Sequence, residues 1–232
     1  MLKLISSMAV RQVLVELTQS WQQATGVEVL VKSVGGVDAA KRVHNGESFD
    51  GVVLASDAID KLASDGRVLV GSRVDLVRSS VAIAVKADGP RPDIGTESAL
   101  RRAVLEAPSI GYSTGPSGVA LLKLFERWGV MDALASRIVQ AAPGVPVGAL
   151  VARGDVALGF QQLSELIHLE GVDVLGTLPK TVSITTIFSA AVCANSLQGE
   201  VLGGLLAFMA SGDTDSVKRR HGLESAVIPD AK

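Results

Sequence analysis

The stretch Ser109-Ile-Gly-Tyr-Ser-Thr-Gly-Pro-Ser-Gly-Val-Ala-Leu-Leu-Lys-Leu-Phe-Glu-Arg-Trp-Gly129 joins an apolar run, a turn of small residues and an amphipathic segment. The run from Ser109 to Tyr112 predicts a short strand. After the turn, apolar residues recur at three- and four-residue spacing, which predicts a helix with one buried face. Pro116 suits the last non-helical or the first helical position, and Ser117 is a competent cap. The stretch therefore predicts a strand, a tight turn and a helix that begins among hydroxyl groups.

The start of this helix is a candidate anion site. The first N–H groups of a helix have no partner within it, and the peptide dipoles place partial positive charge there. Ser113, Ser117 and Gly118 lie around these donors, so a phosphate, sulfate or carboxylate could bind to them. An ordinary capped turn would use the same residues. Two turns of similar composition elsewhere in the chain favour the anion site.

Those two turns belong to an alternation of strands and helices near the N-terminus. Strands are predicted at Leu2–Ile5, Val27–Val31 and Val52–Leu54, each before a turn and a helical pattern. This alternation predicts an α/β protein with mostly parallel sheets flanked by helices. In open α/β sheets ligands bind beyond the carboxyl ends of strands, where Ser6, Ser7, Gly35, Gly36 and Ser113 would lie.

The loop-like segment 87–95 marks a crossing into a second lobe. We expect lobe 1 to comprise residues 1–84 and 186–232, lobe 2 to comprise residues 85–185, and a ligand cleft to lie between them. The remaining predicted elements are strands at Val81–Val85, Val156–Phe160, Val172–Gly176 and Thr181–Ala191, and helices at Thr96–Ala107, after Pro146, Gln198–Ser211 and Thr214–His221.

Composition and charge exclude some classes of function. The 232 residues carry a formal net charge of -2 with both signs interspersed, which disfavours nucleic-acid binding. No stretch approaches the ~18–20 apolar residues of a membrane-spanning helix. Because the sequence begins at once with a strand pattern and without a signal-peptide core, we expect a cytoplasmic protein, or a periplasmic one if a leader has been removed.

No motif predicts a cofactor or a metal. Gly35-Gly36 lacks the dinucleotide fingerprint and the P-loop lysine, and the three histidines lack the spacing of metal ligands. Asp155 and Glu165 have no reason to face each other, so paired-carboxylate hydrolysis gains no support. Cys193 is the only cysteine, which excludes an internal disulfide.

The order of these elements resembles the molybdate-binding solute receptors, which have the type 2 periplasmic-binding-protein fold. The resemblance is carried by Ser6-Ser7, by Gly35-Gly36, by Phe49-Asp-Gly-Val-Val-Leu-Ala-Ser-Asp57 and by Asp155-Val-Ala-Leu-Gly-Phe-Gln161. It implies two α/β lobes that hold an anion through hydroxyl and backbone N–H groups.

The binding residues depart from those of the molybdate receptors. The family's first serine falls near Ala9, just after Ser6 and Ser7, and its second falls near Gly36. Its backbone donors fall near Ser117-Gly118 and Pro146-Val147, and its tyrosine falls near Gln162. Because at least two side-chain ligands are missing, the resemblance implies a changed ligand.

The replacement pattern is similar to the aconitate isomerases, which share this fold. The similarity lies in Tyr112-Ser113, in Ser117-Gly118 and in the segment 151–166. It implies a di- or tricarboxylate ligand and an allylic proton shift, for which Tyr112 is the candidate catalytic group. Arg11 and Lys41 would lie in the first turns of their helices, either as carboxylate partners or as solvated side chains.

Two classes of function follow. We expect an enzyme, an isomerase of a small carboxylate. The alternative is a binding protein: an oxyanion receptor that serves an ABC permease, or a cytoplasmic ligand sensor.

Overall fold

The computed structural model describes residues 1–226 and divides the chain into two compact units. Unit 1 contains residues 1–79 and the chain from 186 onward, and unit 2 contains residues 80–185. Strand β4 (Val74–Lys86) continues across the boundary at 79/80, which lies a few residues before the predicted one. No turn residue interrupts this strand, so its sequence carries no mark of the boundary.

Unit 1 is an α/β unit with a mixed sheet. Its other elements are β1 (Leu2–Ser7), η1 (Met8–Val10), α1 (Arg11–Thr25), β2 (Val29–Val34), α2 (Gly36–His44), β3 (Gly51–Ala55), α3 (Ser56–Ser64), β9 (Thr185–Val192), α9 (Gly199–Ala210), η3 (Gly212–Thr214), α10 (Asp215–Arg220) and β10 (Glu224–Ser225). The strand order is β2-β1-β3-β9-β4. Strand β1 pairs in parallel with β2 and β3, whereas β9 is antiparallel to β3 and β10 is antiparallel to β4.

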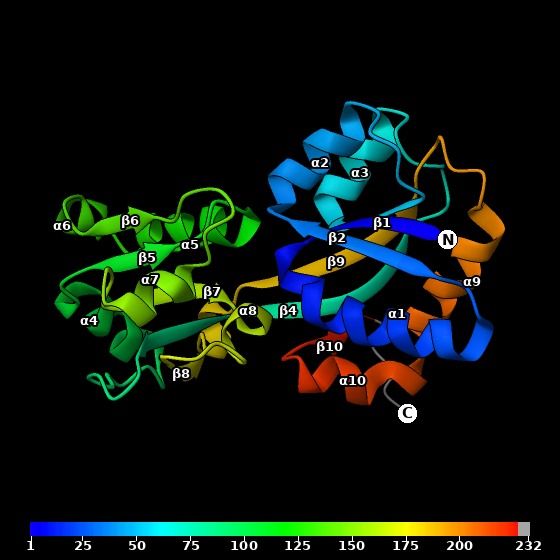
Figure 1. Cartoon of the computed structure of the whole chain (residues 1–232). Helices are drawn as coiled ribbons and strands as arrows, with labels where there is room; N and C mark the ends of the chain where they lie inside the picture. The colour runs from blue at the N-terminus through cyan, green and yellow to red at the C-terminus, as the bar shows by residue number, and fades with distance from the viewer. Residues whose placement is uncertain (227–232) are drawn as a thin grey trace. The chain divides into compact units, whose positions relative to one another are not determined.

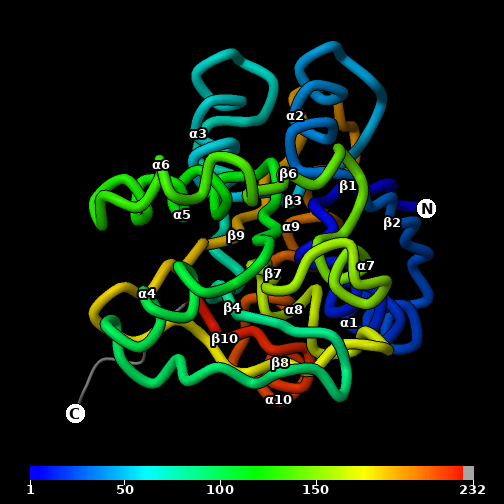
Figure 2. The backbone as a smooth tube through the Cα atoms, turned by 90° about the vertical axis from the view of Figure 1, so that its left-hand side faces the viewer, coloured from blue at the N-terminus to red at the C-terminus, as the bar shows by residue number. Residues whose placement is uncertain are grey.

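Helices cover both faces of the unit 1 sheet. Helix α1 buries Val13, Leu14 and Leu17 in one apolar cluster with residues of α9, because these positions fall on one helical face. It ends at Gly26, whose φ of 72° is the left-handed conformation that glycine tolerates. Helices α2 and α3 cover the opposite face and lie side by side in Figures 1 and 2.

Unit 2 is a second α/β unit. Besides the end of β4 it contains α4 (Glu97–Glu106), β5 (Ile110–Tyr112), α5 (Pro116–Arg127), α6 (Met131–Leu134), β6 (Ile138–Gln140), α7 (Val147–Arg153), β7 (Leu158–Gln162), α8 (Leu163–Leu166), β8 (Val172–Thr177) and η2 (Lys180–Val182). The strand order is β4-β7-β5-β6, and β8 also pairs with β4. Strand β5 is parallel to β6 and β7, whereas β4 is antiparallel to β7 and β8.

Phe125 of α5 lies at the centre of the unit 2 core. It is fully buried, and its ring meets Phe160 of β7 edge-on with centroids 5.8 Å apart. The Trp128 ring also packs against Phe125, with centroids 5.8 Å apart. The helix therefore presents to the sheet the apolar face that its residue spacing predicts.

The differences from the predicted elements have local causes. Strand β2 includes Ser33 and Val34, which were expected in the turn, because both pair in register with the end of β1. The antiparallel strands β4 and β9 make both sheets mixed. Short elements such as β6 and α8 were missed because three or four residues carry no periodic pattern.

None of the helices in residues 1–226 has both the length and the apolar run that a bilayer crossing requires.

Replacement of Phe125 by Ala should destabilise the protein by about 3–5 kcal/mol, because it leaves a cavity between α5 and the sheet. Urea unfolding followed by circular dichroism measures this loss. The control is Val119→Ala on the same helix, since Val119 is 52% exposed and its loss should cost less than about 0.5 kcal/mol. Equal losses in the two variants would contradict the assigned core position.

Candidate functional site

In unit 1, the carboxyl ends of β1 and β2 bring two serines together. The parallel register places Ser6 opposite Ser33, and their hydroxyl oxygens are 2.8 Å apart. Ser6 is fully buried within the sheet. Its hydroxyl therefore links the two strand ends, one residue before the chain leaves β1.

Ser7 lies beside the amino end of α2. A Cβ atom at Gly36 would lie 3.7 Å from the Ser7 Oγ, so the missing side chain leaves the hydroxyl next to the helix start. Ser7 Oγ accepts a hydrogen bond from the Ala9 N–H, and its own O–H can still be donated. Gly35 caps α2 without a side-chain hydrogen bond. The predicted group of Ser7, Gly35 and Gly36 is thus brought together around one helix terminus.

The two predicted cations of unit 1 lie at different places on their helices. Arg11 is the exposed first residue of α1, as expected from the sequence. Lys41 lies in the last turn of α2, so the expectation that it lies in the first turn is wrong. At 1.5 Å rise per residue, Lys41 is about 7.5 Å along the helix from Gly36.

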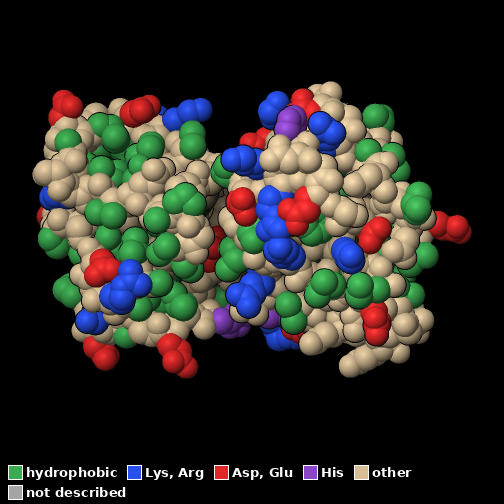
Figure 3. All heavy atoms as spheres, turned by 45° about the horizontal axis from the view of Figure 1, so that its top comes forward, with side chains coloured by type: hydrophobic (Ala, Val, Ile, Leu, Met, Phe, Trp, Pro, Cys, Tyr) green, Lys and Arg blue, Asp and Glu red, His purple; other side chains and the backbone are tan. Residues whose placement is uncertain are grey.

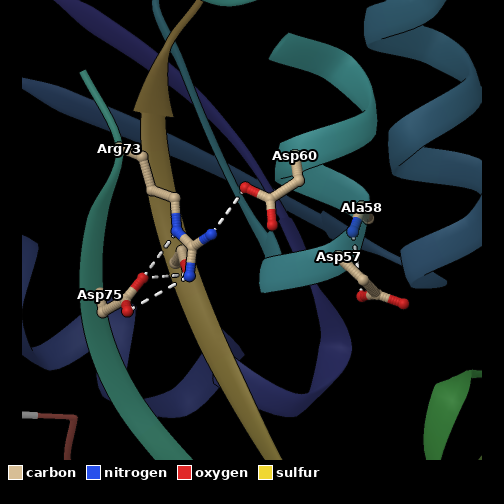
Figure 4. A network of polar contacts seen from close by, with 6 residues as sticks. Asp57, Ala58, Asp60, Arg73 and Asp75 are labelled. Atoms are coloured by element: carbon tan, nitrogen blue, oxygen red, sulfur yellow. Dashed lines mark hydrogen bonds and ion pairs between the residues drawn. The ribbon is translucent and has the colours of Figure 1, made fainter. Parts of the chain in front are cut away.

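A charged network in unit 1 fastens α3 to the sheet (Figure 4). The Arg73 guanidinium donates to Asp60 of α3 at 2.6 Å and to Asp75 of β4 at 2.9 Å. Burial raises the pKa of Asp75, but hydrogen bonds from Arg73 and from Ser189 of β9 outweigh it and lower the pKa overall. Because Arg73 already faces two carboxylates, the network has a structural role.

In unit 2, the carboxyl ends of β5 and β7 lie side by side. Their parallel register places Tyr112 opposite Phe160. The turn after β5 then brings the Ser113 Oγ within 3.2 Å of the Ser117 Oγ. A Cβ atom at Gly118 would lie 1.8 Å from the Ser113 carbonyl oxygen, so this turn closes only with glycine. Three of the predicted residues therefore form one compact turn.

The predicted cap of α5 was wrong. The helix begins at Pro116, its N-cap is Gly115, and no side chain accepts a hydrogen bond there. Ser117 is the second helical residue, 7% exposed, with its hydroxyl directed to Ser113. The hydroxyl therefore belongs to the turn and not to the cap.

Tyr112 is the last residue of β5 and is partly exposed. Its ring carbon Cδ2 would lie 3.2 Å from a Cβ atom at Gly118, so the ring packs against the start of α5. This contact holds the ring beside the Ser113–Ser117 turn. Its catalytic role stays a prediction.

Helix α7 begins at the same edge of the unit 2 sheet. Its N-cap is Pro146, and its first residue, Val147, lies over Gly111 of β5 and Gly159 of β7. Gly148 donates its N–H to the Gln161 side-chain oxygen at 3.0 Å. The predicted donors 146–147 therefore lie near the carboxyl ends of both strands.

Glu165 of α8, to which the sequence analysis gave no role, lies beside the end of β7. The Gln161 amide donates to Glu165 of α8 at 2.7 Å, and Gln162, between them, is buried as the N-cap of α8. Burial raises the pKa of Glu165 to about 7, although the hydrogen bond from Gln161 acts in the opposite direction. The sequence signal was the spacing of Gln161 and Glu165 across a strand–helix junction. Asp155, which was not expected to face Glu165, pairs with Arg153.

Charges elsewhere give no further site. Acidic and basic side chains are interspersed on the face that Figure 3 shows. Within residues 1–226, no three His, Cys, Asp or Glu side chains come close enough to hold a metal ion. Cys193 is buried, and desolvation, with Asp50 nearby, raises the pKa of its thiol to about 12.

Comparison with known proteins shows the family to which this chain belongs. The profile described as bacterial extracellular solute-binding protein matches residues 2–224. The chain belongs to this family. As a solute-binding family member it has the periplasmic-binding-protein fold that the order of its strands and turns predicts.

Two relatives and one solved structure define its place in the family. The chain is 35% identical over 229 residues to an aconitate isomerase of Pseudomonas sp, which covers 96% of this chain and 87% of the relative. It is 24% identical over 153 residues to the molybdate-binding protein ModA of Azotobacter vinelandii, which covers 65% and 60% of the two chains. The structure of the Azotobacter vinelandii periplasmic molybdate-binding protein matches with a TM-score of 0.80, 20% identity and coverage of 99% and 100%.

Replacement of Ser117 by Ala should weaken anion binding while the fold survives, since one hydroxyl is lost and the helix N–H groups remain. Loss of the contact with Ser113 should cost about 0.5–1.5 kcal/mol of stability. Calorimetric titration and urea unfolding measure the two effects. Ser20→Ala, the same change on the exposed side of α1, is the control for affinity. A stability loss with unchanged affinity would assign Ser117 to the fold alone.

Replacement of Glu165 by Gln should make the protein less sensitive to alkaline pH. Because the folded-state pKa is raised from 4.5 to about 7, the carboxyl favours folding most below pH 4.5, and this contribution is lost as the pH rises through 7. The variant should therefore gain stability relative to the wild type between pH 5 and pH 8, by on the order of 1–2 kcal/mol after solvent screening. Urea unfolding of the wild type and the variant at pH 5 and at pH 8 measures the difference between their free energies of unfolding. If this difference is the same at pH 5 and at pH 8, the burial of the Glu165 carboxylate is contradicted.

Proposed function

We propose that this chain binds a small di- or tricarboxylate and isomerises it by an allylic proton shift, as an isomerase of aconitate type. The observation that carries the proposal is the 35% identity to an aconitate isomerase over 96% of the chain. A relationship that extends over nearly the whole chain includes every turn described above. The proposal therefore concerns the whole two-unit protein.

The described turns support an anionic ligand. Unit 1 offers the Ser7 hydroxyl beside the amino end of the nine-residue helix α2. Unit 2 offers the Ser113–Ser117 turn at the amino end of the 12-residue helix α5. Helix termini and hydroxyl groups bind carboxylates as readily as inorganic oxyanions, because both present negatively charged oxygen atoms. A molecule with several carboxylates can use several such turns.

Two substitutions favour an organic acid over a compact oxyanion. Gly36 and Gln162 stand where the molybdate receptors, by the resemblance described above, have a serine and a tyrosine. Gly36 places no side chain against the Ser7 hydroxyl, and Gln162 offers an amide in place of a phenol. Both changes suit a ligand that is larger than a tetrahedral oxyanion.

The alternative is an oxyanion receptor that delivers its ligand to an ABC permease. It is favoured by the family itself and by the ModA relative, which matches over 65% of the chain. A receptor would use the same turns but would release its ligand unchanged.

A thermal-shift screen of molybdate, tungstate, sulfate, phosphate and di- and tricarboxylates separates these ligands. A carboxylate should give the largest shift, since a ligand at ~100 times its dissociation constant adds about 2.7 kcal/mol to the stability of the folded state. A shift confined to molybdate and tungstate would reject the carboxylate in favour of the receptor.

Isomerisation itself is tested by NMR with cis- and trans-aconitate in deuterated water. The wild type should interconvert the isomers and exchange deuterium at the carbons that take part. Tyr112→Phe should lower the rate by about 100-fold or more while binding survives, because we propose that the phenol hydroxyl at the end of β5 returns the proton to the substrate. Tight binding without interconversion in the wild type would make the protein a receptor or a sensor.

A further inference from the structure

Glu165 stands out among the carboxyl groups of unit 2 because a fixed chain of hydrogen bonds holds it. The Gly148 N–H at the start of α7 donates to Gln161 Oε1 at 3.0 Å, and Gln161 Nε2 donates to Glu165 Oε2 at 2.7 Å. Gln161 is 3% exposed, so its amide cannot turn freely toward water. The backbone bond fixes the orientation of this amide, and the amide fixes the carboxyl group.

This carboxyl group lies near the predicted ligand-binding turns. Gln161 follows Phe160 on β7, and Phe160 is paired with Tyr112 at the end of β5. The same strand end therefore adjoins the Ser113–Ser117 turn, and Gly148 adjoins the predicted donors at 146–147. A ligand bound to the carboxyl ends of β5 and β7 would lie within reach of α8.

Within residues 1–226, none of the charged groups around α8 forms a salt bridge with Glu165. Helix α8 packs against β7, β8 and the start of α7. The charged side chains on these elements are Asp173 of β8, which pairs with Arg91, and Arg153 of α7, which pairs with Asp155. The exposed His168 follows α8. With no cation beside it to offset desolvation, burial raises the pKa of Glu165 to about 7.

We propose that Glu165 is the residue that removes the proton in the allylic shift, with Gln161 as its positioning residue and the Tyr112 hydroxyl as the group that returns a proton to the substrate. This role rests on the proposed isomerase function and deepens it. A group that both takes and returns a proton works best when its pKa lies near the working pH, which the raised pKa of Glu165, about 7, satisfies.

The step balances without any further reactant. The Glu165 carboxylate takes a proton from the methylene carbon of the substrate, and the electron pair of that C–H bond spreads over the three allylic carbons and the adjoining carboxylates. The Tyr112 hydroxyl gives its proton to the carbon at the other end of the allylic system, and the Glu165 carboxylic acid then returns a proton to the Tyr112 phenolate through solvent. One C–H bond breaks, one forms, and the double bond moves by one position. Gln161 keeps the carboxyl oriented by donating to its other oxygen.

The test compares four proteins with trans-aconitate as the probe: wild type, Glu165→Gln, Glu165→Asp and Glu170→Gln. Glu165→Gln should lower kcat by about 100-fold or more and leave the dissociation constant within about threefold, because the amide preserves shape and loses the proton acceptor. Glu165→Asp should retain measurable, pH-dependent turnover. Glu170→Gln, the same change at an exposed position, should behave as the wild type.

The positioning role of Gln161 has its own readout. The pH profile of kcat/KM reports on the free enzyme, so its acidic limb should have a midpoint near pH 7 in the wild type. In Gln161→Leu the carboxylate loses its donor, and the limb should move to higher pH. A purely structural role would lower activity at all pH values and leave the midpoint unchanged.

The outcomes separate this inference from the proposed function. If the wild type binds trans-aconitate without isomerising it, the isomerase function fails. If the wild type isomerises it and Glu165→Gln does so within threefold of that rate, the function stands and the role of Glu165 is overturned. Loss of binding together with activity in Glu165→Gln would also overturn it, because Glu165 would then act in binding.

Discussion

The close packing of α7 against β5 and β7 is the constraint on which the unit 2 site depends. Cβ atoms at Gly111 and Gly159 would lie 3.1 Å from the Val147 side chain, and one at Gly148 would lie 2.5 Å from Leu169. Only the smallest residue at these positions lets the helix approach the sheet so closely. That approach brings the Gly148 N–H to Gln161 and so orients the end of β7. Packing in the interior thus determines where the polar groups of the site point.

The sequence predicted the fold well because its signals are local and repeated. The strand–turn–helix units around Ser6-Ser7, Gly35-Gly36 and Ser113–Gly118 are all present, and the resemblance to solute-binding proteins and aconitate isomerases is confirmed. The domain boundary within β4 lacks such a signal, since a continuous strand contains no turn residues to mark it. The site was predicted less completely. The spacing of Gln161 and Glu165 is compatible with their contact, but the raised pKa of Glu165 depends on its burial, which residue spacing does not reveal.

This solute-binding family member has an isomerase among its relatives, so a binding protein and an enzyme can share this fold with few changes in the site. The described anion-binding groups are hydroxyls and helix termini, which suit an oxyanion receptor and a carboxylate enzyme equally. Serine hydroxyls and helix termini can bind an anion but cannot move a proton between carbon atoms at neutral pH. What distinguishes the enzyme is one group that can exist in both protonation states at that pH. In unit 2, the interior supplies such a group by removing water from a carboxyl.

The burial of Cys193 makes the protein convenient for chemical labelling. The thiolate is the reactive form of cysteine, and with its pKa raised to about 12 the native thiol is almost wholly protonated at neutral pH. It is also 2% exposed, at the isolated bridge to Val68 in unit 1. Since it is the only cysteine in the chain, a cysteine introduced at an exposed position would react selectively with a maleimide dye or a spin label. The folded protein therefore accepts a spectroscopic reporter in either unit without removal of its native cysteine.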